Sequence, residues 1–231
     1  MTGEAEIPGG GLGYAALIAR RPRITLAIAV SIGLALSIIF PNMPRAAIHL
    51  TLTPVVRAVL EDPGSPSAGS TRPDVTVVIF TDYQCPVCRA DDPALQRLLD
   101  RDPGVRVIFK DWPNFGALSK GAARAALAAD RQGRYIALHR AMMTDRVSLD
   151  PRAIRTLAAG AGLNVQRLAQ DEAADAVKID TQLARHATQA WTLGLRGTPA
   201  YLIGADLYLG GLDDRHLALA VARARKSGPP T

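Results

Sequence analysis

The chain has only two cysteines, Cys85 and Cys88, which stand three positions apart in the sequence Cys-Pro-Val-Cys. Loop-closure entropy credits a disulfide across so short a loop with roughly 2 kcal/mol, against about 3 kcal/mol for a loop of about 15 residues, before any strain is subtracted. A disulfide that stabilises the fold so little is better explained by chemistry in which the bond forms and breaks.

The residues around this pair predict a strand, a turn and a helix. Residues 75–80 are a β-branched apolar run that is typical of a buried strand. A short polar turn leads to Cys85, and Pro86 then stands where proline is favoured, at the first position of a helix expected over residues 85–99. Cys85 would lie at the helix N-terminus, where free N–H groups and the helix dipole stabilise the nucleophilic thiolate. Cys88, one turn later, is within reach to resolve a mixed disulfide.

Two alternative readings of the cysteine pair are disfavoured. A zinc site needs four ligands, usually cysteines and histidines, and no two histidines of this chain have ligand-like spacing. Two buried, inert cysteines would not require a helix start with a proline between them. We therefore predict a redox-active pair and no metal site. The histidines are His49, His139, His186 and His216.

An apolar segment near the N-terminus predicts a membrane helix. Residues 24–40 carry no charge, and Pro41 follows them directly. As a helix they would span roughly 25 Å, slightly less than the hydrocarbon core of about 30 Å. Arg20, Arg21 and Arg23 precede the segment, and such a cluster keeps its end of the helix on the cytoplasmic side.

A cleaved signal peptide is the competing interpretation of this segment. Cleavage after Ala46 or Ala47 would place Pro44 or Arg45 at the third position before the cut, where a small residue is expected. We therefore predict an uncleaved signal anchor over residues 24–41. The rest of the chain would then lie on the far side of the membrane.

The chain divides into four expected parts. Residues 1–23 read as a cytoplasmic tail, followed by the anchor. Residues 42–74 read as a linker, because their second half is rich in proline, glycine and serine. A folded domain is expected over residues 75–227.

The order of elements in that domain predicts an α/β fold. Residues 75–80, 85–99 and 105–110 read as a β-α-β unit with parallel strands. A helical insertion follows, and the chain ends in two strands and a helix. The expected insertion helices cover residues 117–130, 135–143, 150 to 160 or 162, a short segment capped by Asn164, and 171–193. The later strands cover residues 199–203 and 206–209, and the last helix opens at Asp213 or Asp214.

At this point the chain resembles the DsbA-like branch of the thioredoxin-fold family, over roughly residues 73–227. The resemblance rests on Phe80-Thr81-Asp82-Tyr83-Gln84-Cys85-Pro86-Val87-Cys88, on the helical insertion, and on Gly197-Thr198-Pro199 before a strand. It implies a thioredoxin-like fold of β-α-β, helical insertion and β-β-α. It also implies a cis bond between Thr198 and Pro199, which would pack beside the disulfide and bind the substrate backbone. A plain turn proline is the alternative for Pro199.

The chain departs from DsbA itself between the two cysteines. Pro86 is retained, but Val87 stands where DsbA has a histidine, and valine offers neither charge nor N–H donor to a thiolate. We therefore expect the pKa of Cys85 to lie below that of free cysteine but to be less depressed than with histidine. Lys110 and Asp111, at the end of the second strand, read either as charged groups near the pair or as an exposed strand end.

The net charge of +6 has no nucleic-acid motif to accompany it. Basic residues are spread among acidic ones rather than clustered, and only 5% of residues are aromatic, which favours a solvated basic surface and no nucleic-acid partner.

The expected function is that of a membrane-anchored thiol–disulfide oxidoreductase, most simply a disulfide donor. It would act on protein thiols or disulfides, need no cofactor, and lie in a bacterial inner membrane as a monomer with its catalytic domain in the periplasm. The resemblance implies a DsbB-like membrane partner for reoxidation. A thioredoxin-like scaffold module with incidental thiols, a dedicated disulfide reductase and a copper metallochaperone are the alternatives.

Overall fold

The computed structural model describes residues 26–33, 46–145 and 148–228. The chain separates into two compact units, residues 1–44 and residues 45–231. In the first unit, the described residues are helical. The predicted tail and the remainder of the predicted anchor lie outside the described residues. Within the described ranges, no helix has both the length and the apolar character needed to cross a bilayer.

The second unit is built on a mixed sheet with the strand order β1-β6-β5-β3-β4-β2. β3 and β4 are parallel and joined through α4, which confirms the predicted β-α-β unit. β5 pairs antiparallel with β3 and with β6, which confirms the second part of the predicted thioredoxin-like order. The strands are β1 (Ile48–His49), β2 (Ser67–Gly69), β3 (Val75–Thr81), β4 (Val105–Asp111), β5 (Ala200–Ile203) and β6 (Asp206–Leu209).

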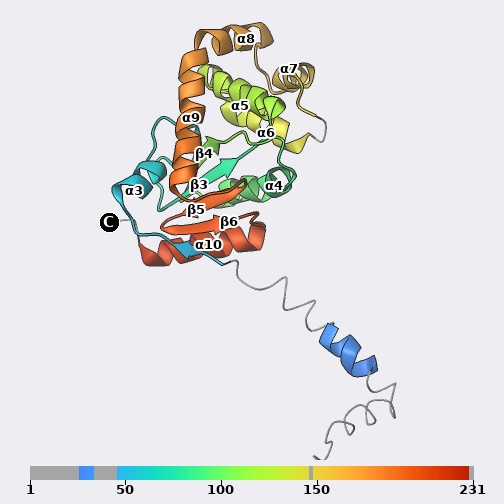
Figure 1. The fold of residues 1–231 in the computed structure, drawn as a ribbon, viewed down its shortest axis with the longest axis vertical. Helices are drawn as coiled ribbons and strands as arrows, with labels where there is room; N and C mark the ends of the chain where they lie inside the picture. The colour runs from blue at the N-terminus through green and yellow to red at the C-terminus, as the bar shows by residue number, and fades with distance from the viewer. Residues whose placement is uncertain (1–25, 34–45, 146–147, 229–231) are drawn as a thin grey trace, which may run out of the picture. The chain divides into compact units, whose positions relative to one another are not determined.

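Side chains alternate across the central strands, so the sheet has two buried faces. Val77 and Ile79 of β3 face a large core shared with α4, α10 and the helical insertion. Val78 and Phe80 face a smaller core shared with α3 and α9. In the view of Figure 1, α10 lies below the strands and α5 to α8 lie above them. The helices are α3 (Pro54–Leu60), α4 (Pro86–Arg101), α5 (Ala117–Ala129), η2 (Asp130–Gln132), α6 (Tyr135–Thr144), α7 (Pro151–Gly160), α8 (Val165–Ala174), α9 (Ala176–Thr192) and α10 (Asp214–Ser227).

The short helix that Asn164 was expected to cap is confirmed as α8, but the helix predicted over residues 171–193 begins later than expected. α8 continues to Ala174, and α9 begins at Ala176. The break lies at Asp175, whose φ of −100° and ψ of 15° leave the helical region. Leu168 and Ile179 on either side of the break are both buried in the same core, so the apolar pattern continues across it and does not reveal it.

The interpretation of residues 42–74 as a linker is wrong for the part that the structure describes. β1 pairs with β6, β2 pairs with β4, and α3 packs against the core, so the domain begins well before Val75. One of the two glycines of this segment fits tightly against the sheet. Gly69 has a φ of +93°, and a Cβ added there would collide with the carbonyl oxygen of Val105.

Candidate functional site

Cys85 is the N-cap of α4, as predicted. Its backbone is extended, and its sulfur accepts a hydrogen bond from the N–H of Cys88 at 3.4 Å, with Pro86 in the first turn. Both cysteines are free thiols and both are buried. The helix terminus therefore directs backbone donors at the Cys85 sulfur.

The two thiols differ sharply in acidity. Hydrogen bonds from the Cys88 side chain, the Cys88 N–H and the Thr198 side chain outweigh burial and lower the pKa of Cys85 to about 6. Burial raises the pKa of Cys88 well above its usual range, and the neighbouring Cys85 raises it further. At neutral pH, Cys85 is a thiolate and Cys88 a protonated thiol. The predicted depression of the Cys85 pKa is confirmed, whereas its comparison with a histidine at position 87 stays a prediction.

We expect the alkylation rate of Cys85 in the reduced chain to rise with pH through a midpoint near 6, because only the thiolate reacts. In Cys88→Ala the midpoint should move upward, since this variant removes the thiol that donates the strongest hydrogen bond. Labelling with iodoacetamide at a series of pH values, with the alkylated fraction followed by mass spectrometry, would measure both midpoints. A midpoint near 8.5, the value of a free cysteine, would contradict the assignment.

Thr198 and Pro199 lie beside Cys85, where the resemblance placed them. The bond between them is cis, as that resemblance implied. The carbonyl oxygen of Thr198 is 3.3 Å from the Cys85 sulfur and accepts its thiol proton when the sulfur is protonated. The Thr198 hydroxyl is buried and otherwise without a partner among the described residues, so it can donate to the thiolate. Val87 is 47% exposed next to the pair.

Asp82 holds the turn that carries Cys85. Its buried carboxylate accepts hydrogen bonds from the N–H of Gln84 at 2.7 Å and from the hydroxyl of Ser119 at 2.6 Å. It also accepts from the backbone N–H groups of residues 114–115. The turn is thereby fastened to the start of the helical insertion. Sequence reasoning treated this aspartate only as part of a polar turn.

A chain of buried polar side chains extends from the neighbouring Tyr83. The Tyr83 hydroxyl is 2.9 Å from Nδ1 of His139, whose Nε2 lies 3.0 Å from the carboxylate of Asp92 in α4. Tyr83 also contacts the hydroxyl of Tyr135, which donates to Asp111 at 3.0 Å. Burial raises the pKa of Asp111 to about 6. Tyr135 and His139 are one turn apart in α6, whereas Tyr83, Asp92 and Asp111 come from the turn before α4, from α4 and from β4, and no sequence motif links these elements.

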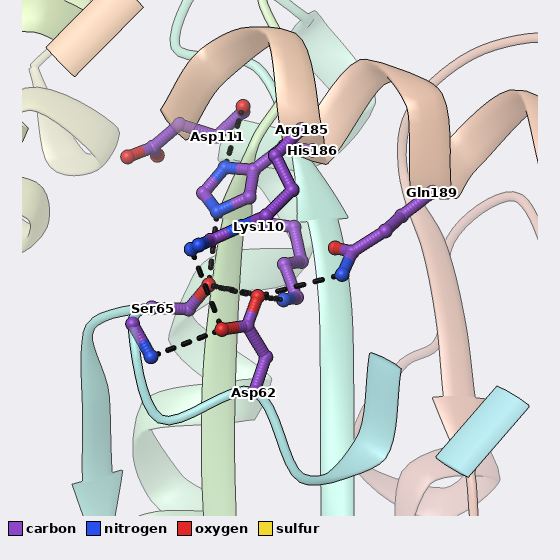
Figure 2. A network of polar contacts seen from close by, with 8 residues as sticks. Asp62, Ser65, Lys110, Asp111, Arg185, His186 and Gln189 are labelled. Atoms are coloured by element: carbon purple, nitrogen blue, oxygen red, sulfur yellow. Dashed lines mark hydrogen bonds and ion pairs between the residues drawn. The ribbon is translucent and has the colours of Figure 1, made fainter. Parts of the chain in front are cut away.

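Lys110 and Asp111 are buried, so the interpretation as an exposed strand end is wrong. Figure 2 shows Lys110 from β4 meeting Asp62 and Ser65 of the loop after α3, with His186 of α9 above them. The Lys110 ammonium donates to the Asp62 carboxylate and to Ser65 at 3.0 Å. His186 contacts Ser65 at 2.9 Å and the backbone carbonyl of Asp111 at 3.1 Å.

The charges in this second cluster are strongly coupled. Burial opposes ionisation of Asp62, but Lys110 and the N–H of Gly64 outweigh it and bring the pKa of Asp62 to about 2. Burial lowers the pKa of Lys110 to about 8 even though Asp62 favours its charged form. Burial and the nearby Lys110 also lower the pKa of His186 to about 3, so its ring is neutral. The cluster joins the loop after α3 to β4 and α9.

Comparison with known proteins places this geometry in context. Residues 76–221 match the family described as DSBA-like thioredoxin domain. A thioredoxin-like oxidoreductase from Silicibacter pomeroyi is 38% identical, with a TM-score of 0.70, covering 73% of this chain and 96% of that one. A periplasmic thioredoxin-like protein from Salmonella enterica serovar Typhimurium is 31% identical, with a TM-score of 0.66 and coverages of 76% and 99%. The thiol-disulfide exchange protein alpha-DsbA2 from Wolbachia pipientis is 26% identical, with a TM-score of 0.69 and coverages of 72% and 90%.

The curated relatives are much longer proteins. The Na(+)/H(+) antiporter NhaA 3 of Salinispora tropica is 27% identical over 158 residues, which are 68% of this chain and 24% of the antiporter. The chain thus spans about a quarter of the length of the curated relatives that it matches.

Proposed function

The chain belongs to the family of DSBA-like thioredoxin domains, which are thiol–disulfide oxidoreductases, and on this premise we propose that Cys85 and Cys88 donate a disulfide to substrate proteins outside the cytoplasm. The opposite pKa shifts of the two cysteines are the observation that carries the proposal. A low thiol pKa makes Cys85 a good leaving group, and a stable Cys85 thiolate stabilises the reduced form of the pair, which makes the disulfide more oxidising.

The reaction balances in two exchange steps. A substrate thiolate attacks the Cys85 sulfur of the disulfide, a mixed disulfide forms, and the Cys88 sulfur leaves and takes up a proton. A second substrate thiolate then attacks the first substrate sulfur in that mixed disulfide, which forms the substrate disulfide, breaks the bond to Cys85 and releases Cys85 as a thiolate. Counted from its two thiols, the substrate loses two electrons and two protons. The pair gains both electrons, Cys88 takes up one proton, and the other proton passes to solvent because Cys85 is released as a thiolate. A DsbB-like membrane partner would reoxidise the pair.

The neighbouring residues have supporting roles in this proposal. The backbone of Thr198 and Pro199 would pair with an extended substrate segment next to the reacting sulfur. Pro86 begins α4 directly after Cys85, so the free N–H groups of the first helical turn point at the Cys85 sulfur. Val87 cannot supply the positive charge of a histidine to the Cys85 thiolate, so the reduction potential of the cysteine pair would be less oxidising than with histidine at this position. No resident cofactor is needed for thiol–disulfide exchange.

The membrane part of the proposal rests on the sequence. Residues 24–41 would form a single-pass signal anchor in a bacterial inner membrane, with residues 1–23 in the cytoplasm and the catalytic domain in the periplasm. The uncharged run and the preceding arginines support this orientation. The periplasmic relative from Salmonella supports the compartment. We propose that the protein is a monomer, because a single membrane anchor is compatible with one.

The redox state of the full chain in bacterial cells tests direction and location together. After acid quenching, we expect the chain in the membrane fraction with Cys85 and Cys88 as a disulfide. After mild reduction, a membrane-impermeant maleimide should label Cys85 in intact spheroplasts. The variant with serine at both positions supplies the unlabelled baseline. A reduced pair at steady state would favour the dedicated reductase, and labelling only after lysis would contradict the periplasmic location.

A second candidate is a domain that binds within a membrane transport assembly and has incidental thiols. The antiporter names of the curated relatives favour it. It differs from the first proposal in one testable respect, because its biological effect would survive replacement of both cysteines.

A further inference from the structure

The exchange reaction places a negative charge on a buried sulfur. When a thiolate attacks Cys85, the bond between the two cysteines breaks and its electron pair stays on Cys88, which is only 2% exposed. Burial and the neighbouring Cys85 raise the pKa of Cys88 well above its usual range. The Thr198 hydroxyl and the Asp82 N–H favour the thiolate but do not offset this effect. The Cys88 sulfur is therefore a poor leaving group unless a further donor meets it.

Two carboxylates on the same helix make a charge on Cys88 still more costly. Asp91 and Asp92 follow Cys88 in α4 by three and four residues, which places them one turn further along the same side of the helix. The buried Asp92 carboxylate lies 3.0 Å from Nε2 of His139 and accepts a hydrogen bond from the Gln96 amide at 3.3 Å. Like charges at these spacings repel, so only a donor from another element can stabilise a thiolate here.

Tyr201 of β5 carries a suitable donor. Its side chain faces the large core together with both cysteines, and it pairs in the sheet with Ile79 of β3. Tyr201 is fully buried, and its hydroxyl makes no hydrogen bond within the part of the chain that the structure describes. Burial raises the pKa of Tyr201 well above its usual value, and the charges of Asp91 and Cys88 raise it further. The hydroxyl is therefore a protonated donor within electrostatic reach of the Cys88 sulfur.

We propose that the Tyr201 hydroxyl donates a hydrogen bond to the Cys88 sulfur as that sulfur leaves, and so stabilises the charge that develops on it. A donor that is in place before the reaction lowers the barrier without reorganisation. Cys88 is uncharged in the disulfide and is a protonated thiol in the reduced pair, so the hydroxyl has its full effect only between these states.

The step leaves Tyr201 itself unchanged. The bond from the attacking sulfur to Cys85 forms, the bond between Cys85 and Cys88 breaks, and the proton that Cys88 then binds comes from solvent. The inference rests on the proposed order of attack at the two cysteines. It does not depend on the direction of the overall reaction, because opening and closing of the disulfide share one transition state.

Tyr201→Phe removes only this hydroxyl and tests its role. The oxidised full chain in detergent would be mixed with excess glutathione, quenched with acid, and labelled with maleimide to follow the release of the Cys88 thiol. We expect release to be about tenfold slower in Tyr201→Phe, which is the lower end of what a hydrogen bond to a charged group contributes.

Tyr208→Phe is the matched control and should retain the rate of the unaltered chain. Tyr208 lies opposite Tyr201 in the register of β5 and β6 and is also buried. The charges that act on its hydroxyl are those of Asp206 and Arg223. The control therefore makes the same chemical change on the same face of the sheet, beside other charged groups.

Three further measurements on Tyr201→Phe separate this role from a structural one. Alkylation of Cys85 in the reduced chain should keep its rate, because Cys88 does not leave in that reaction. The reduction potential should stay the same, since the hydroxyl speeds opening and closing of the disulfide equally. Stability towards urea should not fall, because removal of a buried hydroxyl without a partner loses no hydrogen bond.

An unaltered rate of disulfide opening in Tyr201→Phe would overturn the inference, as would an equal slowing in Tyr208→Phe. A slower alkylation of Cys85, a shifted potential or a lower stability would also overturn it, because the hydroxyl would then act through packing. Failure of the proposed disulfide donation would look different. The unaltered chain would then have the potential of a reductant, while the effect of Tyr201→Phe on the opening rate would remain.

Discussion

Replacing Cys85 with serine is expected to reduce disulfide exchange to the uncatalysed background. A hydroxyl cannot form a disulfide, and the chain has no third cysteine to substitute for it. Cys88→Ser should behave differently. Cys85 keeps its position at the helix N-terminus, so it still forms a mixed disulfide, but no second thiol is present to resolve it. The complex with a substrate should therefore accumulate.

Non-reducing electrophoresis after mixing each variant with a disulfide-containing substrate protein would show both outcomes. We expect a covalent complex that reductant dissolves with Cys88→Ser and none with Cys85→Ser. A reversed pattern would exchange the roles of the two cysteines. The variant with serine at both positions also decides between the two candidate functions, because a binding module would keep its cellular effect without either thiol.

The parts of the fold that the sequence predicted are those set by local signals. The apolar run of β3 and the proline at the start of α4 determine their elements within a few residues, and both were found. β1 and β2 contain two and three residues and exist only through pairing with β6 and β4. Local pattern cannot reveal such strands, so the segment that contains them looked like a linker.

The same division holds for the site. The two cysteines are close in sequence and were located from their spacing and helix position. Thr198 lies 113 positions from Cys85 and was placed beside it only by the family resemblance. Asp62 and Lys110 lie 48 positions apart, and neither has a sequence signal for the other. A lysine at the end of an apolar strand reads as a surface residue until the buried carboxylate that accompanies it is known.

Asp62→Ala is expected to destabilise the folded domain by about 3–5 kcal/mol, because it leaves the Lys110 ammonium buried without its carboxylate. Lys110→Met should cost much less. Asp62 then still accepts hydrogen bonds from Gly64 and Ser65 and lies 3.3 Å from Arg185. Combining the two substitutions should recover much of the stability lost in Asp62→Ala, since no charge is then left unpaired. Urea unfolding of the full chain measures all three.

The pH dependence of stability gives an independent check on this pair. The pKa of Asp62 falls from 3.8 to about 2 on folding, so its contribution is complete above pH 3.8 and disappears as the pH falls towards 2. The pKa of Lys110 falls from 10.5 to about 8, so the unfolded chain binds more protons between these values and stability should rise with pH across that window. Lys110→Met should lack this alkaline rise and should also show a smaller acid loss, because Lys110 is the main group that lowers the pKa of Asp62. If stability rises equally with alkaline pH in Lys110→Met, the rise comes from the titration of another group. Lys110 would then contribute to stability through its packing and not through its charge.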